Sequence, residues 1–265
     1  MHLSTPDGPI DPQAQRRADL RRLRRALQAS AAFVALMLVM YLAQGALDWR
    51  AFAVMPGSAR GLVGVLAAPL LHGSVEHIVA NAASVLLLGT LAAAVYPRAT
   101  LRALPLLWLG SGLGAWLLGA PDSYHIGASG LTHGLMFLVF VLGLLRRDRP
   151  AIAAGMIAFF LYGGMLLTVL PQEPGVSWQS HLGGALAGVL SAVLFRRSDP
   201  AAPRRQYSWE LEEEAEAAAA QAEAAQLEPP RPADVPVLWQ RTQQEHPRGT
   251  VLPFPPRSQD GRGGD

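Results

Sequence analysis

Six apolar stretches alternate with short polar segments along the middle of the chain, at roughly 31–47, 75–95, 103–119, 129–145, 151–170 and 181–195. Each has about 15 to 21 residues, close to the length that an α-helix needs to cross the hydrocarbon core of a bilayer. Backbone groups in lipid are satisfied only within helices or closed β-barrels, and these stretches lack the two-residue alternation of barrel strands. The pattern predicts an all-α, polytopic membrane protein with six transmembrane helices.

The arginine residues orient these helices. They gather before the first stretch, between the second and third, between the fourth and fifth, and after the sixth, whereas the three opposite loops contain only Arg50 and Arg60. Short loops rich in basic residues remain in the cytoplasm. We therefore expect both termini to be cytoplasmic, in a bacterial inner membrane. Cleavage of a signal peptide near Ala43 is an alternative, but removal of the first stretch would break the even charge pattern.

Composition separates the membrane region from two polar ends. Hydrophobic residues make up 51% of the chain and charged residues 16%, and the charges concentrate in the ends. We expect an Arg-rich cytoplasmic segment over 1–29, a six-helix domain over 30–197, and a cytoplasmic tail over 198–265. Within the tail, 209–228 favours an acidic helix, and the Pro- and Gly-rich remainder is typical of disorder. We interpret this tail as solvated; a partner-binding role is the alternative.

The predicted orientation brings distant polar residues to one depth. The second, fourth and sixth helices all run inward from the periplasmic side, so their N-termini lie in one layer. His72, His77 and Asn81 lie near the start of the second helix, Ser129 opens the fourth, and His181 opens the sixth. Ionisable side chains at membrane depth are costly and often mark a functional site. These residues are therefore the candidates for chemistry.

Ser129 and His181 form the candidate reacting pair. Ser129 stands between Gly127 and Gly130, and the first turn of a helix offers free amide donors that favour an oxyanion. His181 is followed by glycines at 183, 184 and 188, and facing glycine surfaces allow two helices to approach closely. Each motif alone has a plain structural reading: small-residue helix packing for the serine, and an interfacial histidine facing water for the imidazole.

His77 and Asn81 are four residues apart and therefore share one helical face. Both side chains can donate hydrogen bonds, as a developing oxyanion requires; helix–helix hydrogen bonding is the alternative role. His72 is expected to precede the helix and to fasten the first outer loop. The absence of cysteine excludes disulfides, thiolate metal ligands and a cysteine nucleophile.

The three segments HGSVEHIVAN, GASG and HLGGALAG resemble the rhomboid family of intramembrane serine proteases in residue type, order and spacing. The resemblance covers roughly 30–197 and implies the bacterial six-helix form. It implies Ser129 as nucleophile and His181 as general base. It further implies an oxyanion hole of His77, Asn81 and the Ser129 backbone N–H, and structural support from His72, Gly127, Gly130, Gly184 and Gly188.

Two positions depart from the family pattern. The family often has an aromatic residue four positions after the serine, stacked on the catalytic histidine, whereas this chain has His133. An imidazole can stack or hydrogen-bond there, or be a plain interior histidine, so the role of His133 is left open. The family's Trp-Arg pair before the first histidine is replaced here by Val63-Gly64. We interpret His125, outside the motif, as a loop residue.

The resemblance implies single-pass transmembrane proteins as substrates, the lipid bilayer as surroundings, and no cofactor, metal or nucleic acid; the oligomeric state is left open. One rival is a metalloprotein using the histidines, but His72 and His77 are about 140° apart around a helix. The other is a non-catalytic membrane protein, either a transporter or a rhomboid-like scaffold that binds client transmembrane helices.

Overall fold

The computed structural model of the chain describes residues 12–171, 175–200 and 208–227. The chain divides into two units, Met1–Pro203 and Arg204–Asp265. The Pro- and Gly-rich tail beyond residue 228, which we expect to be disordered, lies outside the described residues.

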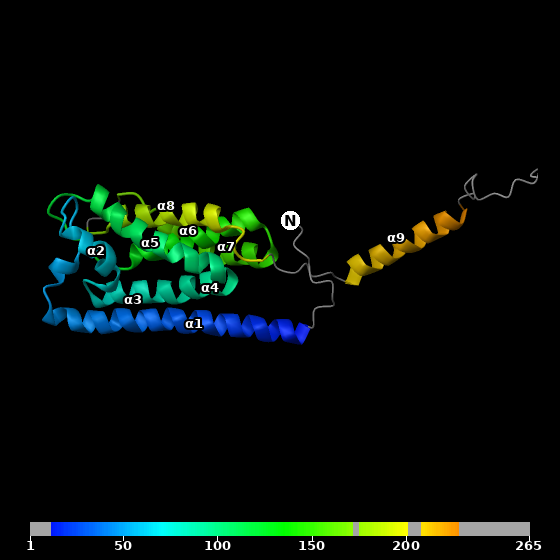
Figure 1. Cartoon of the computed structure of the whole chain (residues 1–265), viewed down its shortest axis with the longest axis horizontal. Coiled ribbons are helices and arrows are strands. Elements are labelled where there is room, and N and C mark those ends of the chain that lie inside the picture. The colour runs from blue at the N-terminus through cyan, green and yellow to red at the C-terminus, as the bar shows by residue number, and fades with distance from the viewer. Residues whose placement is uncertain (1–11, 172–174, 201–207, 228–265) are drawn as a thin grey trace, which may run out of the picture. The chain divides into compact units, whose positions relative to one another are not determined.

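The described part of the first unit consists of helices joined by short turns (Figure 1). Among its described residues, extended pairing is limited to an isolated bridge between Val54 and His125. The helices are α1 (Pro12–Ala43), α2 (Gly61–Ala67), α3 (Val75–Ser84), α4 (Thr90–Val95), α5 (Pro97–Leu118), α6 (Ser129–Arg146), α7 (Arg149–Tyr162) and α8 (Trp178–Phe195). Shorter turns are η1 (Gln44–Ala46), η2 (Trp49–Phe52), η3 (Ala68–Leu70), the π-helical η4 (Val85–Gly89) and η5 (Gly163–Leu166).

Five helical segments of the described chain are long and apolar enough to cross a membrane. The turn η4 joins α3 to α4, so the second predicted helix is one continuous segment. The sixth predicted helix is α8, which has 18 residues like α6 but carries Gln179, Ser180 and His181 in its first turn. The all-α, polytopic architecture predicted from the apolar pattern is confirmed. The five segments are Gln13–Ala46, Val75–Val95, Pro97–Leu118, Ser129–Arg146 and Arg149–Leu166.

Helix α7 is shorter than the apolar stretch 151–170 predicts. It ends at Tyr162, continues as the 3₁₀ turn η5, and gives way to a non-helical turn from Leu167 onward. Gly163 and Gly164 stand at the break, and glycine is a poor helix former because it loses the most backbone freedom on folding. The backbone after this break is free to bond to other parts of the molecule.

Helix α6 lies at the centre of the bundle, and most of its side chains are buried. It packs against α5, α7 and α8, while α1 lies along α3 and α4 (Figure 1). Leu135, Leu138 and Leu142 point into the main apolar cluster together with Leu107 of α5. The outward faces of the other helices carry exposed leucine, valine and phenylalanine side chains, as a lipid-facing surface requires.

Glycines bring α6 and α8 into backbone contact. A Cβ atom built on Gly184 would overlap the carbonyl oxygen of Gly130, and one built on Gly188 would overlap the carbonyl oxygen of Gly134. On its other side, α8 meets α5 in the same way, at Gly183. Small residues are the usual means of close helix approach in membranes, where packing rather than water exclusion drives association.

The ends of α6 and α8 opposite Ser129 are held together by buried polar contacts. Asp199 accepts hydrogen bonds of 2.9 Å from the backbone N–H groups of Arg98 and Ala99, which begin α5. Arg146 donates to Asp148 and to backbone carbonyls beyond the end of α8, including that of Asp199 at 2.9 Å. A carboxylate at a helix N-terminus and a guanidinium at a C-terminus both satisfy backbone groups that the helix leaves unpaired.

The second unit contains one described helix, α9 (Ser208–Leu227). It agrees with the acidic helix predicted over 209–228, and its described side chains are exposed. Whether it binds a partner stays a prediction.

We predict that Gly184→Ala lowers the free energy of unfolding by about 1–3 kcal/mol, the usual cost of inserting a methyl group into a packed interior. The methyl group would displace Gly130 and separate α6 from α8. Gly45→Ala is the matched control, because nothing lies within 4 Å of its added methyl group. Thermal unfolding in detergent micelles measures both variants. Equal stability of the two variants would contradict the backbone contact.

Candidate active site

Ser129 is the first residue of α6, and the turn before it is set by Gly127. Gly127 has a φ of +107°, a conformation that favours glycine, and its N–H donates to the carbonyl of Ala68 at 2.8 Å. A Cβ atom at this position would lie 2.6 Å from Cε1 of His77. The missing side chain therefore allows the turn that carries Ser129 to lie against the His77 ring.

His181 reaches Ser129 from the first turn of α8. Its Nε2 atom lies 2.8 Å from the Ser129 hydroxyl oxygen, and its Nδ1 atom lies 2.9 Å from the carbonyl oxygen of Thr168. The ring is buried. Gly130 directly follows Ser129, and Gly184 lies about one turn after His181, so the backbone approach of α6 and α8 at these two glycines accounts for the short distance between the two side chains.

These two contacts determine which nitrogen of neutral His181 carries the proton. A carbonyl oxygen only accepts hydrogen bonds, so Nδ1 must be the protonated nitrogen that donates to Thr168. Nε2 then has a free lone pair, which faces the Ser129 hydroxyl group. This is the tautomer in which an imidazole can remove a proton from a serine.

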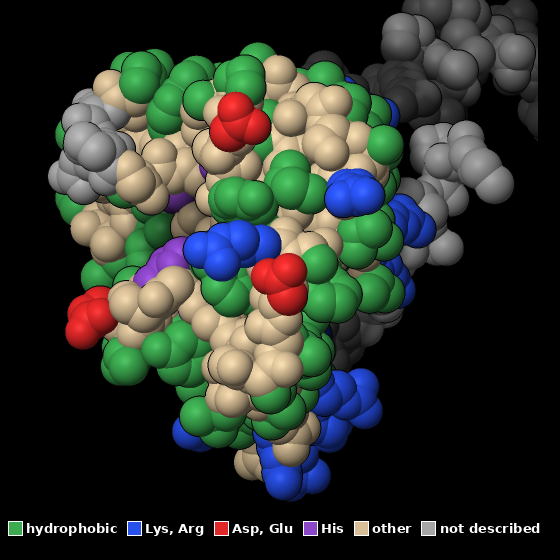
Figure 2. Space-filling model, turned by 90° about the vertical axis from the view of Figure 1, so that its left-hand side faces the viewer, with side chains coloured by type: hydrophobic (Ala, Val, Ile, Leu, Met, Phe, Trp, Pro, Cys, Tyr) green, Lys and Arg blue, Asp and Glu red, His purple; other side chains and the backbone are tan. Residues whose placement is uncertain are grey.

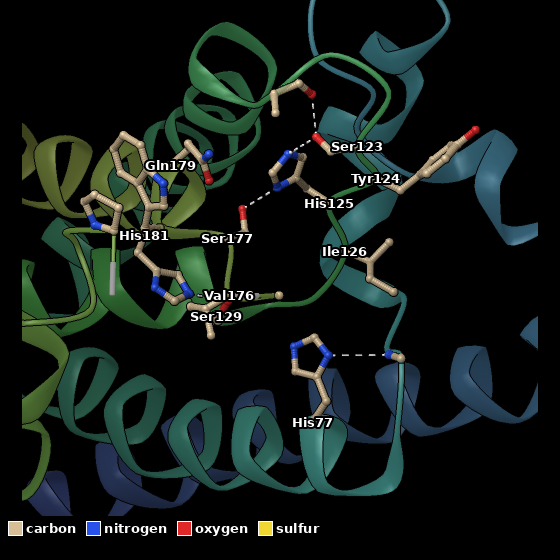
Figure 3. A pocket seen from close by; sticks show the side chains of 15 residues that line it. His77, Ser123, Tyr124, His125, Ile126, Ser129, Val176, Ser177, Gln179 and His181 are labelled. Atoms are coloured by element: carbon tan, nitrogen blue, oxygen red, sulfur yellow. Dashed lines mark hydrogen bonds between the residues drawn. The ribbon is translucent and has the colours of Figure 1, made fainter. Parts of the chain in front are cut away.

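The two expected oxyanion donors of α3 are placed differently. His77 lines the same cavity as Ser129, and its Nδ1 atom accepts a 3.4 Å hydrogen bond from the Gly73 N–H, so its Nε2–H is left as a donor (Figure 3). Asn81 is buried, and its amide donates to the His77 carbonyl oxygen within α3 at 3.0 Å. It is not among the residues that line the cavity, so His77 is the more direct candidate.

His72 lies in the loop before α3, as expected, and its side chain is fully buried. Its backbone N–H donates to the side-chain oxygen of Gln44 at 3.1 Å, and its ring meets the His77 ring edge-on at 5.0 Å between centroids. Burial and the neighbouring His77 lower the pKa of His72 to about 4, and the nearby Leu70 carbonyl offsets this only in part. His72 thus joins the end of α1 to the site as a neutral ring.

His133 stacks on His181, with 3.9 Å between ring centroids and 12° between ring planes. Its Nδ1 atom lies 2.7 Å from the Ser129 carbonyl oxygen, and its Nε2 atom lies 2.8 Å from the hydroxyl oxygen of Thr168. Of the roles left open for His133, the structure shows both stacking and hydrogen bonding. A phenylalanine at this position could stack but could not make the hydrogen bonds.

His125 belongs to the wall of the cavity as well as to the loop where it was expected (Figure 3). It pairs through its backbone with Val54 in both directions at 3.0 Å. Its ring bonds to the hydroxyl groups of Ser123 at 2.9 Å and Ser177 at 2.7 Å. Burial lowers the pKa of His125. The ring thus fastens the loop before α6 to the segment before α8.

The cavity in front of Ser129 has a volume of about 890 Å³. Its wall includes His77, Ser129 and His181, with Tyr124, Ile126 and Val176 as apolar neighbours. The end of the molecule where α3, α6 and α8 begin is hollowed there, and histidine side chains are visible within the hollow (Figure 2). Ser129 is partly exposed and opens onto this hollow.

Within the described residues, no group of three or more histidine, aspartate or glutamate side chains has an arrangement that would hold a metal ion. The cavity chemistry is that of a hydroxyl group and imidazoles.

Comparison with known proteins identifies the family. Residues 59–198, more than half of the chain, match the model of the Rhomboid domain. The chain belongs to the rhomboid family. Members of this family are typically intramembrane serine proteases, and the matched region contains the three motifs on α3, α6 and α8.

Relatives of this rhomboid protein occur in mycobacteria. Uncharacterized proteins of Mycobacterium tuberculosis and Mycobacterium bovis are 42% identical to it over 149 residues, which is 53% of this chain and 62% of theirs. An uncharacterized protein of Mycobacterium leprae is 39% identical over 142 residues, 50% of this chain and 56% of its own. The chain thus aligns with less than two thirds of the length of these relatives.

Three residues of the site were not predicted as site residues from the sequence. Thr168 contributes through a backbone carbonyl, which no side-chain pattern reveals, and its hydroxyl group lay inside a predicted apolar helix. His125 was assigned to a loop, and Ser177 carried no signal at all. The concentration of five histidines near one membrane face was the available hint for His125.

We predict that acidification destabilises this protein partly through His72. Because the pKa of His72 is lower in the folded protein (about 4) than its ordinary value of 6.5, the unfolded chain binds the proton first. Its contribution to stability is complete above pH 6.5 and is lost as the pH falls towards about 4. The thermal unfolding temperature should therefore fall less steeply with acidification in His72→Phe than in the parent protein. Identical slopes would contradict a neutral, buried His72.

Proposed function

We propose that this protein is an intramembrane serine endopeptidase that cleaves transmembrane helices through a dyad of Ser129 and His181. The observation that carries the proposal is the 2.8 Å contact between the Ser129 hydroxyl oxygen and the Nε2 atom of His181, whose Nδ1–H is held by a carbonyl. Membership of the rhomboid family supports the same activity.

In this mechanism His181 removes the hydroxyl proton as the Ser129 oxygen attacks the carbonyl carbon of a substrate peptide bond. The C–N bond then breaks, the imidazolium gives its proton to the leaving amine, and an acyl-enzyme ester remains. A water molecule entering from the cavity loses a proton to His181 and attacks the ester. The ester C–O bond then breaks, the imidazolium returns its proton to the Ser129 oxygen, and the product with the new carboxyl group leaves.

The tetrahedral intermediates carry a negative oxygen that needs donors. The backbone N–H of Ser129 opens α6, where amide groups have no intrahelical partner. The Nε2–H of His77 faces the same cavity. In a site screened from bulk water, such fixed donors stabilise developing charge more than they would in solution.

The arginine distribution supports a site that opens to the periplasmic side of a bacterial inner membrane, with both termini in the cytoplasm. The substrates are then single-pass membrane proteins whose helices unwind near that face, because a peptide bond inside a regular helix is shielded from attack.

We predict that Ser129→Ala abolishes both labelling by a fluorophosphonate probe and cleavage of a transmembrane-helix substrate, because the Ser129 hydroxyl oxygen is the group that faces the Nε2 lone pair of His181 among the described residues. Gel fluorescence and mass spectrometry of the purified protein in detergent or liposomes measure the two activities.

Ser123→Ala and Ser177→Ala are matched controls for this variant. Both hydroxyl groups line the same cavity and bond to a histidine, His125. We expect labelling to persist in both. If labelling survives in Ser129→Ala and is lost in one of the controls, the serine substituted in that control is the nucleophile instead of Ser129. Binding of client helices without cleavage by the parent protein would favour a non-catalytic scaffold.

We predict that His77→Ala lowers kcat about 100- to 1,000-fold, the usual cost of losing one oxyanion donor. Asn81→Ala should cost less, because the Asn81 amide donates within α3 and Asn81 is not among the residues that line the cavity. Steady-state cleavage of one substrate by both variants, with thermal stability as the folding check, tests this order. A larger loss in Asn81→Ala would assign the main donor to the amide instead.

A further inference from the structure

Thr168 contacts both of the stacked histidines. Its carbonyl oxygen accepts the 2.9 Å hydrogen bond from His181, and its hydroxyl oxygen lies 2.8 Å from Nε2 of His133. The residue is half-buried in the turn that follows η5. Thr168 belongs to neither α6 nor α8. The imidazole of His181, which extends from α8 and contacts Ser129 of α6, is therefore also held by a third segment of the chain.

The early end of α7 makes this position possible. Inside a regular helix, a carbonyl group points along the helix axis and bonds to the N–H four residues later. Because α7 ends at Tyr162 and η5 at Leu166, the Thr168 carbonyl is outside the helix and is directed at His181. The helix break at Gly163 and Gly164 therefore leaves the Thr168 carbonyl available to bond to His181.

The contacts close into a ring of four residues. The Ser129 hydroxyl meets Nε2 of His181, Nδ1 of His181 meets the Thr168 carbonyl, the Thr168 hydroxyl meets Nε2 of His133, and Nδ1 of His133 meets the Ser129 carbonyl. Each of the four distances is between 2.7 and 2.9 Å. The ring begins and ends on Ser129.

The two carbonyl groups, of Ser129 and Thr168, determine which atoms carry the protons in this cycle of hydrogen bonds. In neutral His133, Nδ1 carries the proton because it faces the Ser129 carbonyl, so Nε2 must accept. The Thr168 hydroxyl then donates to His133, although the Met165 carbonyl at 3.1 Å competes for its single proton. One assignment therefore satisfies every contact in the ring while leaving His181 as an acceptor towards Ser129.

We propose that Thr168 and His133 are positioning residues that hold His181 in the tautomer with a free Nε2 lone pair. The kinetic consequence rests on the proposed protease function, whereas the tautomer itself does not. Thr168 takes the orienting part that a carboxylate has in a serine–histidine–aspartate triad, with a neutral carbonyl in place of the charge. His133 accepts the hydrogen bond from the Thr168 hydroxyl group and so holds Thr168 in place, and it also stacks on the imidazole of His181.

Thr168→Val tests the hydroxyl group while keeping the backbone carbonyl and the side-chain shape. We expect kcat to fall about 3- to 10-fold with KM unchanged, the range of one lost neutral hydrogen bond. Thr168→Ser keeps the hydroxyl group and should restore kcat. Thr100→Val is the matched control, because the buried Thr100 hydroxyl in α5 has no hydrogen-bond partner within the described part of the chain. Equal kcat for Thr168→Val and Thr100→Val would overturn the proposal.

His133→Phe keeps a stacked ring and loses both hydrogen bonds. In a double-mutant cycle with Thr168→Val, the losses of kcat should not add, because both residues belong to the same cycle of hydrogen bonds. The double variant should therefore be no slower than the slower single variant. Losses that multiply would mean that the residues act independently, which overturns the ring. If His133→Phe does not fold, the Thr168 series alone decides between the two outcomes.

The His181 tautomer is observable without any activity. In protein labelled with heavy-nitrogen histidine, the NMR shifts of the His181 ring, assigned by difference from His181→Phe, distinguish a protonated Nδ1 from a protonated Nε2. We expect protonated Nδ1 in the parent protein. We expect a mixture in Thr168→Val, because loss of the hydrogen bond to His133 releases the turn and with it the carbonyl that orients His181. A single unchanged tautomer in both overturns the positioning role. An expected tautomer in a parent protein that cleaves nothing would instead reject the protease function.

Discussion

The close approach of α6 and α8 is the contact on which the geometry of this site depends. Gly130 and Gly184 allow one backbone to lie against the other, and Ser129 and His181 stand at the adjacent end of the same two helices. In a bilayer there is no water exclusion to force helices together, so close packing has to come from small residues. The 2.8 Å contact between hydroxyl and imidazole follows from that packing rather than from a flexible loop.

Both ends of the α6–α8 pair are also tied by polar groups, but by different chemistry. At the Ser129 end, imidazoles, hydroxyl groups and carbonyls are joined by neutral hydrogen bonds. At the other end, Arg146 and the Asp148 and Asp199 carboxylates satisfy helix termini with charged groups. Neutral groups can be desolvated at modest cost, whereas charged groups need partners of opposite sign or helix ends. This division allows the reacting end to be buried without an unpaired charge.

Broken helices are the second recurring device. A peptide carbonyl inside an uninterrupted membrane helix is already bonded, so it has nothing to offer a side chain. The end of α7 releases Thr168, and the turn at Gly127 releases the first amide groups of α6. In both places the irregular backbone hydrogen-bonds to another part of the protein, the Thr168 carbonyl to His181 and the Gly127 N–H to Ala68. A membrane protein thus obtains backbone donors and acceptors for chemistry where its helices stop.

Apolar length and charge bias predicted six helical stretches and one layer for the histidines and the serine, and the rhomboid motifs predicted that Ser129 pairs with His181. The roles of backbone atoms became visible only in the folded structure. There α7 ends early, the Thr168 carbonyl is directed at His181, His133 makes two hydrogen bonds, and His125 lines the cavity whereas Asn81 does not. A carbonyl is the same in every residue, so its role depends on where helices cross and end.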